Sequence, residues 1–143
     1  MSASNEPQFL DTNILIYAFD ISTGRKHEIA KALYKKLLID NQGCTSLQIL
    51  QEFFVSAVYK SPRKMGILEA RTIIENLSAW PVHRPFACDI LAAIDLGARY
   101  QISFWDALVI RSAQQSGCKI LWSEDLGHEQ EYDGVLVRNP FAE

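Results

Sequence analysis

Short apolar runs alternate along the chain with longer segments in which apolar residues recur every three to four positions. The short runs predict strands that are buried on both faces. The longer segments predict amphipathic helices. The expected strands are residues 8–10, 44–45, 80–82, 119–122 and 135–137. The first helix is expected to start near residue 13, and the last is expected at 104–115. The helices between them have apolar stripes at 29–38, 50–58, 67–77 and 86–94.

The alternation of strands and helices predicts one α/β domain over residues 1–143, a three-layer α/β/α sandwich with a central parallel sheet. Residues 1–7 are polar and are expected to form a flexible N-terminal tail. Turn-forming residues separate the elements at 40–43, 61–62 and 139–140. No repeat or low-complexity linker divides the chain, which favours a single core.

Four acidic residues stand at particular places in this pattern. Asp11 follows the first strand, Asp106 opens the last helix, and Asp125 follows the fourth strand. Glu52 interrupts the apolar stripe of the third helix. Ligands of such sheets bind at the carboxyl ends of the strands, where the following loops and helices meet. We therefore expect the four acids to converge at that edge.

Each of the four acids also has an explanation that involves no ligand. Asp11 is suited to cap the helix that follows it. Asp106 lies three residues after Ser103, which is the spacing of a capping box. Glu52 and Asp125 would then be solvated acids. The set of four favours a site, because all four have hydrophobic neighbours and none is adjacent to Lys or Arg.

Converging carboxylates repel one another unless a cation neutralises them. Carboxylate oxygens suit Mg²⁺ or Mn²⁺, whereas the absence of clustered His and Cys argues against zinc. Two such ions can stabilise both the attacking and the leaving oxygen of a phosphodiester. The acids therefore predict a metal-dependent site for phosphoryl transfer or phosphodiester hydrolysis.

Other chemically active side chains are expected to be structural. Asp20 and Asp89 are predicted to be surface acids, and Trp105 is expected to pack beside Asp106 rather than to stack on a base. The three cysteines are predicted to be small buried residues in a reducing compartment.

Composition narrows the function classes further. With 14 Lys and Arg against 17 Asp and Glu, the formal net charge is -3, which excludes a simple basic clamp for nucleic acid. The polar N-terminus resembles no secretory signal, and no apolar run is long enough to cross a membrane. The chain is expected to be a cytoplasmic protein without a membrane partner.

Four segments resemble the PIN-domain family, and within it the VapC-type toxin ribonucleases of type II toxin–antitoxin modules. Their order and spacing carry the resemblance, which extends from Phe9 to Phe141. The segments are Phe9–Tyr17 (FLDTNILIY), Thr45–Phe53 (TSLQILQEF), Phe104–Ile110 (FWDALVI) and Leu121–Leu126 (LWSEDL), and the end of the chain, Gly134–Phe141 (GVLVRNPF), is similar as well.

The resemblance implies a PIN-like fold and an endoribonuclease that depends on Mg²⁺ or Mn²⁺, with one or two ions. It implies that Asp11 and Asp106 are the main direct ligands, and that Glu52 and Asp125 hold ions directly or through water. A metal-bound water would hydrolyse the RNA phosphodiester bond in line and leave a 5′-phosphate and a 3′-hydroxyl.

Three more residues are assigned supporting roles by the resemblance. Asn13 and Ser46 match polar positions that commonly line the pocket and orient Asp11 or water. Glu124 would substitute for Asp125 or assist it. The basic run Lys60, Arg63 and Lys64 is the first candidate for RNA-backbone contacts, and the second candidate cluster is Arg25, Lys26, Lys31, Lys35 and Lys36.

The resemblance also implies two protein partners, a second copy of the chain in a homodimer and a small cognate antitoxin that covers the acidic groove. Apolar residues of the early helices are candidates for these contacts, although core packing explains them equally well. They are Tyr17, Phe19, Phe54 and Tyr59.

Two other functions compete with this interpretation. A haloacid-dehalogenase-like phosphatase also places an aspartate at the end of its first strand, but it needs a second Asp two positions later. The chain has Asn13 there, so the phosphatase is excluded on chemistry. A catalytically silent PIN-like domain that binds RNA or a partner remains the alternative.

Overall fold

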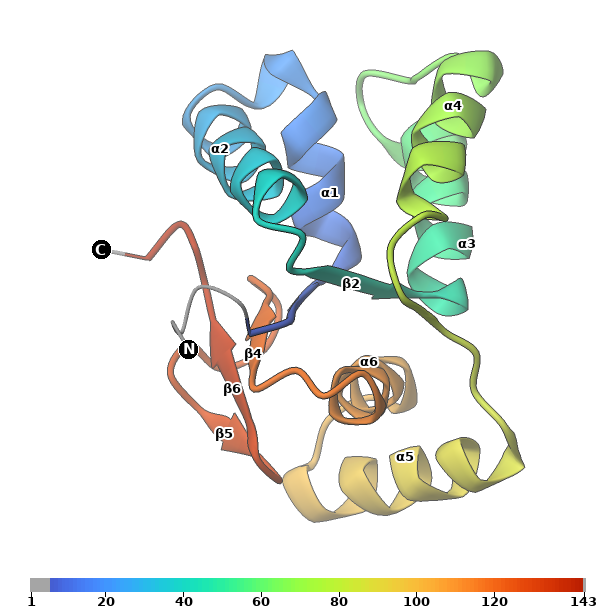
Figure 1. Cartoon of the computed structure of the whole chain (residues 1–143), viewed down its shortest axis with the longest axis vertical. Helices are drawn as coiled ribbons and strands as arrows, with labels where there is room; N and C mark the ends of the chain where they lie inside the picture. Colours follow the sequence, from blue (N-terminus) through green and yellow to red (C-terminus); the bar gives the residue numbers. More distant parts are fainter. Residues whose placement is uncertain (1–5, 143) are drawn as a thin grey trace.

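The computed structural model of the chain describes residues 6–142, so residues 1–5 of the expected tail lie outside the described range. Within it, strands form one sheet in the order β3-β2-β1-β4-β6-β5 (Figure 1). Neighbouring strands are parallel except β5 and β6, which pair antiparallel. The strands are β1 (Gln8–Leu10), β2 (Gly43–Ser46), β3 (Val82–His83), β4 (Ile120–Trp122), β5 (Glu131–Tyr132) and β6 (Val135–Arg138).

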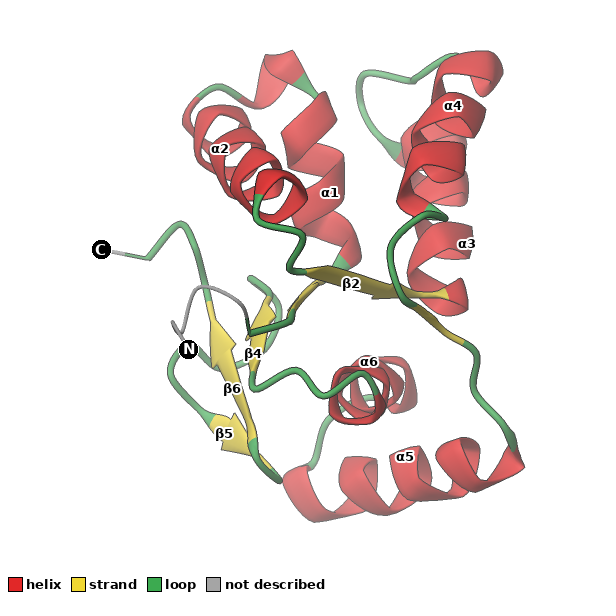
Figure 2. Ribbon diagram, viewed as in Figure 1, coloured by secondary structure: helices red, strands yellow, loops and turns green. Residues whose placement is uncertain are grey.

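Helices cover both faces of this sheet. The first four helices lie on one side of β2, and the last two lie on the other (Figure 1, Figure 2). The helices are α1 (Thr12–Phe19), α2 (Arg25–Ile39), α3 (Leu47–Val55), α4 (Ile67–Leu77), α5 (Ala87–Tyr100) and α6 (Phe104–Gln115), with short η2 (Ile21–Thr23) and η3 (Ser56–Lys60). The predicted α/β/α sandwich is confirmed, with a sheet that is mostly rather than wholly parallel.

The core lies around the two central strands. Phe9 and Leu10 of β1 and Leu121 of β4 are completely buried, because helices pack on both faces of the sheet. This burial explains why the strands are apolar throughout instead of alternating. None of the described helices is long and apolar enough to span a lipid bilayer.

Several element boundaries differ from the sequence prediction. The strand expected at 80–82 lies at Val82–His83, and η2 and β5 were not predicted. The third helix was expected to be one α-helix through residue 58. It is α-helical to Val55 and continues as a π-helix over Ser56–Lys60, closed by a hydrogen bond of 2.7 Å from the Ser61 N–H to the Ser56 carbonyl. Such π-turns occur frequently at functional sites.

Two residues of the turn between α2 and β2 have different roles. Asn41 adopts the left-handed conformation (φ 55°) that reverses the chain. Gly43 serves packing instead, because a Cβ atom there would lie 2.4 Å from the Trp80 ring. Trp80 in turn stacks on Tyr34 of α2, with ring centroids 5.7 Å apart.

Three predictions about surface and core residues are wrong. Asp20 is buried rather than exposed, because its carboxylate accepts hydrogen bonds from the Ser22 N–H and hydroxyl at the start of η2. Asp89 is also buried, as described below. Cys88 lies on the surface, while Cys44 and Cys118 are buried as expected.

Asp89 joins α5 to α6 and β3. Its carboxylate accepts hydrogen bonds from the Phe86 N–H (2.8 Å) and from Nε of Arg111 (2.9 Å), and Nε2 of His83 lies 3.4 Å away. The Phe86 N–H, the Arg111 guanidinium and the nearby His83 lower the pKa of Asp89, although burial acts in the opposite direction. Asp89 is therefore a structural acid that is matched by cations.

We predict that Asp89→Ala destabilises the protein by about 3–5 kcal/mol near neutral pH, because it removes one partner of a buried ion pair. Since the folded-state pKa of Asp89 is lowered, its contribution is present above the unfolded-state pKa and is lost as the pH falls through the folded value. Urea denaturation at pH 7 and at pH 3 measures both effects. Asp95→Ala, an exposed change on the same helix, is the control and should stay within about 0.5 kcal/mol of wild type.

Candidate active site at the carboxyl edge of the sheet

The site lies where the order of the strands changes direction. From β1 the chain proceeds outward to β2 and β3, and then returns to β4 on the other side of β1. Asp11 directly follows β1, and Asp125 follows the neighbouring β4. The carboxyl ends of adjacent strands at such a switch point are the usual ligand site of an open α/β sheet.

A cavity of about 510 Å³ opens at this edge, and all four acids line it. Asp11 and Asp125 come from the strand ends, Glu52 from α3 and Asp106 from the first turn of α6. The structure thus brings together residues that are separated by up to 114 positions. Other residues of its wall are Thr12, Asn13, Gln48, Val55, Lys60 and Trp105.

Asp11 combines a capping role with a place in the cavity. Its Oδ1 accepts a hydrogen bond of 2.8 Å from the Thr12 N–H and so caps α1, while its Oδ2 accepts one of 2.9 Å from the Ser123 hydroxyl. Burial raises the pKa of Asp11 to about 6, with the nearby carboxylates Asp125 and Asp106 acting in the same direction.

Asp106 differs from the other three acids. The Ser103 hydroxyl caps α6 by accepting a hydrogen bond of 3.1 Å from the Asp106 N–H. The reciprocal bond of a capping box, in which the Ser103 N–H would donate to the Asp106 carboxylate, does not form in the described structure. In residues 6–142 the Asp106 carboxylate has no hydrogen-bond or ion-pair partner, so it is the acid most available for a ligand.

Glu52 is fixed by residues of two helices. Its Oε1 accepts a hydrogen bond of 2.8 Å from the Thr12 hydroxyl, and its Oε2 accepts one of 3.2 Å from the Gln48 side-chain amide. The same Gln48 nitrogen also donates to the Trp105 carbonyl at 3.1 Å. Gln48 therefore ties the acid of α3 to the first turn of α6.

Asp125 is exposed and is held by Asn13. Nδ2 of Asn13 donates to Oδ2 of Asp125 at 2.9 Å, and the Asp125 N–H donates to the Ser123 hydroxyl at 3.2 Å. Burial of the carboxyl raises the pKa of Asp125, and the charges of Glu124 and Asp106 raise it further. Asn13 thus orients Asp125, not Asp11 as the resemblance suggested.

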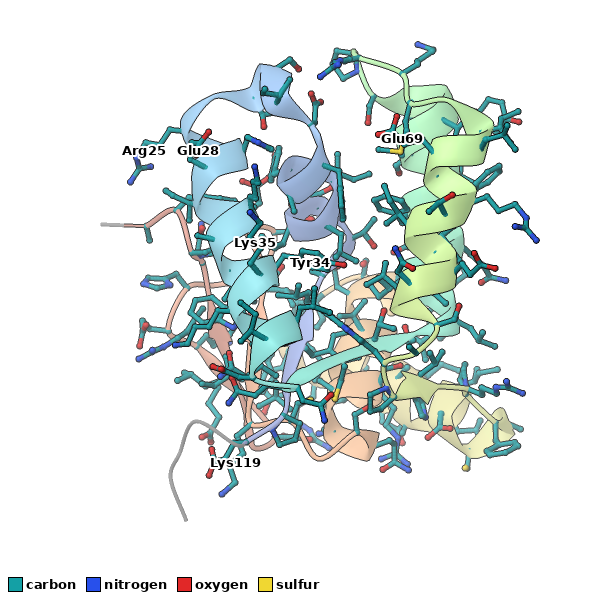
Figure 3. All side chains as sticks on the ribbon, turned by 45° about the horizontal axis from the view of Figure 1, so that its top comes forward. Arg25, Glu28, Tyr34, Lys35, Glu69 and Lys119 are labelled. Carbon is teal, nitrogen blue, oxygen red and sulfur yellow. The ribbon has the colours of Figure 1, made fainter. Side chains whose placement is uncertain are left out.

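Four residues that were assigned supporting or RNA-binding roles do not line the cavity. The Ser46 hydroxyl caps α3 by accepting from the Ile49 N–H. Glu124 accepts hydrogen bonds from the Tyr17 hydroxyl and, at 2.7 Å, from Nζ of Lys26, and it does not line the cavity. Arg63 and Lys64 line a separate, smaller cavity between α1 and α4, beside the end of α4 where Figure 3 labels Glu69.

The structure adds four residues to the site that sequence reasoning had not placed there. Thr12, Gln48 and Ser123 position the acids, and Trp105 lines the cavity with 60% of its surface exposed. Trp105 was expected to pack beside Asp106, and the structure leaves most of its side chain exposed there. The position of Trp105 next to Asp106 in the sequence could have indicated that it lies at the site. The sequence pattern around the three polar residues does not distinguish them from residues that only cap helices.

Comparison with known proteins places the chain among related folds. The profile described as PIN domain matches residues 9–131. The search of curated proteins gives no match.

Three solved structures share the fold at low sequence identity. A toxin–antitoxin complex from Klebsiella pneumoniae has a TM-score of 0.62 at 22% identity, covering 94% of this chain and 98% of that one. The DNA-bound VapBC of Salmonella typhimurium has a TM-score of 0.63 at 16% identity, with the same coverage. The sarcin–ricin loop cleaving toxin VapC20 of Mycobacterium tuberculosis has a TM-score of 0.60 at 17% identity, covering 81% of this chain and 88% of that one.

The family profile covers most of the chain. The strand order of the chain places the four acids at the carboxyl edge of the sheet. The chain belongs to the PIN domain family.

Proposed function

We propose that the chain is a Mg²⁺- or Mn²⁺-dependent endoribonuclease and acts as the toxin of a VapBC-type toxin–antitoxin system. The observation that carries this proposal is the common cavity of Asp11, Glu52, Asp106 and Asp125. Two of its carboxyls have raised pKa values, and a third has no partner in the described structure. Such groups need a cation to remain ionised together.

The donor set fits a hard divalent cation. All four side chains offer carboxylate oxygens, which Mg²⁺ and Mn²⁺ prefer. In the described residues no three His, Cys, Asp or Glu side chains are already grouped tightly enough to hold an ion among themselves. Mg²⁺ usually binds through one or two carboxylates and keeps several water ligands, so it does not require such a group of three.

Each residue of the site would have its own role in holding the metal. Asp11 and Asp106 would hold one or two ions directly, and Glu52 and Asp125 would bind directly or through water. Ser123, Thr12 and Asn13 fix Asp11, Glu52 and Asp125 by hydrogen bonds. When bound, the metal supplies Lewis-acid activation of water and stabilises the charge that develops on the phosphate.

The structural neighbours support RNA and an antitoxin as partners. One neighbour is described as a toxin that cleaves the sarcin–ricin loop, and two others are toxin–antitoxin assemblies. Tyr59 packs edge-to-face against Phe54 and is 58% exposed. Because of this exposure, the pair is available for contact with an antitoxin or a second copy of the chain. Tyr17 instead donates a hydrogen bond to Glu124. The catalytically silent domain remains the competing function.

Asp106→Asn tests the nuclease directly. Removing a metal ligand that stabilises transition-state charge by several kcal/mol should lower cleavage at least about 100-fold. The fold should persist, because the carboxylate has no partner in the described residues. The assay follows Mg²⁺- or Mn²⁺-dependent cleavage of purified transfer and ribosomal RNA.

Glu124→Gln is the matched control, since this acid is adjacent to Asp125 in sequence but lies outside the cavity, and it should retain activity. The nuclease proposal fails if the wild type cleaves no RNA with either ion, or cleaves equally well in excess chelator.

Asp11→Asn tests the metal site without an activity assay. Since burial raises the folded-state pKa of Asp11 from 3.8 to about 6, its ionisation destabilises the metal-free fold increasingly as the pH rises through that interval. In chelator at pH 8, the free energy of unfolding of Asp11→Asn should therefore exceed that of the wild type by up to about 3 kcal/mol. The variant should accordingly unfold at a higher urea concentration. The difference should shrink toward pH 4, and Asn preserves the cap.

Mn²⁺ should raise the melting temperature of the wild type and have little effect on Asp11→Asn, because binding to the folded state alone stabilises it. An Asp11→Asn variant that is less stable than wild type in chelator at pH 8 would contradict the destabilising charge at Asp11 and the need for a cation there.

The antitoxin partner has its own test. A reading frame for a small DNA-binding protein is expected next to the gene for this chain. Expression of the chain alone should arrest growth, and co-expression of that neighbour should restore it. Continued growth on expression of the folded wild type, with Asp106→Asn as the matched inactive control, would contradict the toxin role.

A further inference from the structure

Trp105 presents a large aromatic surface directly beside the acids. Its side chain is 60% exposed, it precedes Asp106 in the first turn of α6, and it lines the same cavity as the four carboxylates. Phe104 supports the indole edge-to-face, with ring centroids 5.0 Å apart at an angle of 75°. Gln48 holds the Trp105 carbonyl with the nitrogen that also donates to Glu52. The backbone that carries the indole is thus tied to the acidic site.

The charge of the metal-free cavity makes an apolar contact important for an RNA ligand. Four carboxylates line it, and Lys60 is the cation among its described lining residues. Without the metal, phosphate attraction, which dominates most nucleic-acid binding, is therefore weak at this place. Val55, which is 42% exposed, and the indole of Trp105 add apolar surface to the same wall. A base that stacks there would supply affinity that the electrostatics do not.

We propose that Trp105 is the stacking platform for one unpaired nucleobase next to the phosphate on which the acids act. This inference rests on the proposed ribonuclease function and narrows its substrate to single-stranded or looped RNA. Bases inside a helix have both faces covered by their neighbours, whereas unpaired bases in loops can stack on aromatic side chains. The cavity of about 510 Å³ lies within the range of about 300–1,000 Å³ that encloses small organic ligands, so one nucleotide fits.

Binding of a short oligonucleotide tests the platform separately from catalysis. The probes are a fluorescein-labelled single-stranded RNA of twelve nucleotides and mixed sequence, and the same backbone without bases. Anisotropy titrations in chelator, where hydrolysis does not interfere, compare the full-length wild type with Trp105→Ala and Trp105→Phe. Phe86→Ala is the matched control, because Phe86 is the aromatic N-cap residue of α5, is 73% exposed and does not line the cavity.

Trp105→Ala should weaken binding of the base-containing RNA about 5- to 150-fold, the loss expected for one stacked base. Binding of the abasic backbone should not change. Trp105→Phe should keep most of the affinity, and Phe86→Ala all of it. Because Trp105 is exposed, the melting temperatures of all variants should stay close to that of the wild type.

The platform is overturned if Trp105→Ala binds the RNA as tightly as the wild type, or loses equal affinity for both probes. It is also overturned if the change weakens only the complex with a co-expressed antitoxin. Cleavage by the wild type without any effect of Trp105→Ala on binding would reject the platform and keep the nuclease. Base-dependent binding through Trp105 without cleavage in Mg²⁺ would keep the platform and reject the nuclease.

Discussion

The arrangement of the site depends on one buried carboxylate, that of Asp11. It lies at the end of the central strand β1 with 6% of its surface exposed, and only neutral donors, Thr12 and Ser123, hold it. Burial and two neighbouring carboxylates raise its pKa to about 6. Without a cation, the folded protein therefore keeps this acid at a cost in stability. A position that costs stability is more consistent with function than with capping alone, because Asn would cap the helix equally well.

The segment from Asp11 to Asn13 connects three of the four acids of the cavity, Asp11 itself, Glu52 and Asp125. Ser123, at the end of β4, donates to Asp11 on β1, while Thr12 donates to Glu52 on α3 and Asn13 donates to Asp125. These bonds join the junction of β1 and α1 to α3 and to the segment after β4, so the adjacency of β1 and β4 helps to fix the positions of the acids. The acids are thereby positioned by the fold itself, while Asp106 remains without a partner in the described residues.

Most of the fold could be predicted because its signals are local. The apolar runs at 8–10 and 119–122 and the helix at 104–115 have the period of their element, and the structure places them there. The boundaries that failed depend on tertiary contacts. The π-helix at Ser56–Lys60 has the same apolar period as an α-helix, and β5 is a two-residue strand that exists because it pairs with β6. Three of the four acids were visible because each follows or opens an element, and Glu52 because it interrupts an apolar stripe. Thr12 and Ser123 act on acids that are 40 and 112 positions away, and Gln48 also bonds the Trp105 carbonyl 57 positions away.

Asp11 and Asp89 show why burial itself does not identify a functional acid. Both carboxylates are almost completely buried and both accept a backbone N–H at the start of a helix. Arg111 and His83 accompany Asp89, so its pKa is lowered and its charge stabilises the fold. Asp11 has acids where Asp89 has cations, so its pKa is raised. The sequence shows no cation adjacent to either residue, and only the packing of α5 against α6 and β3 supplies Arg111 and His83. A buried acid that the fold leaves without such a cation is the position at which a ligand must provide the charge.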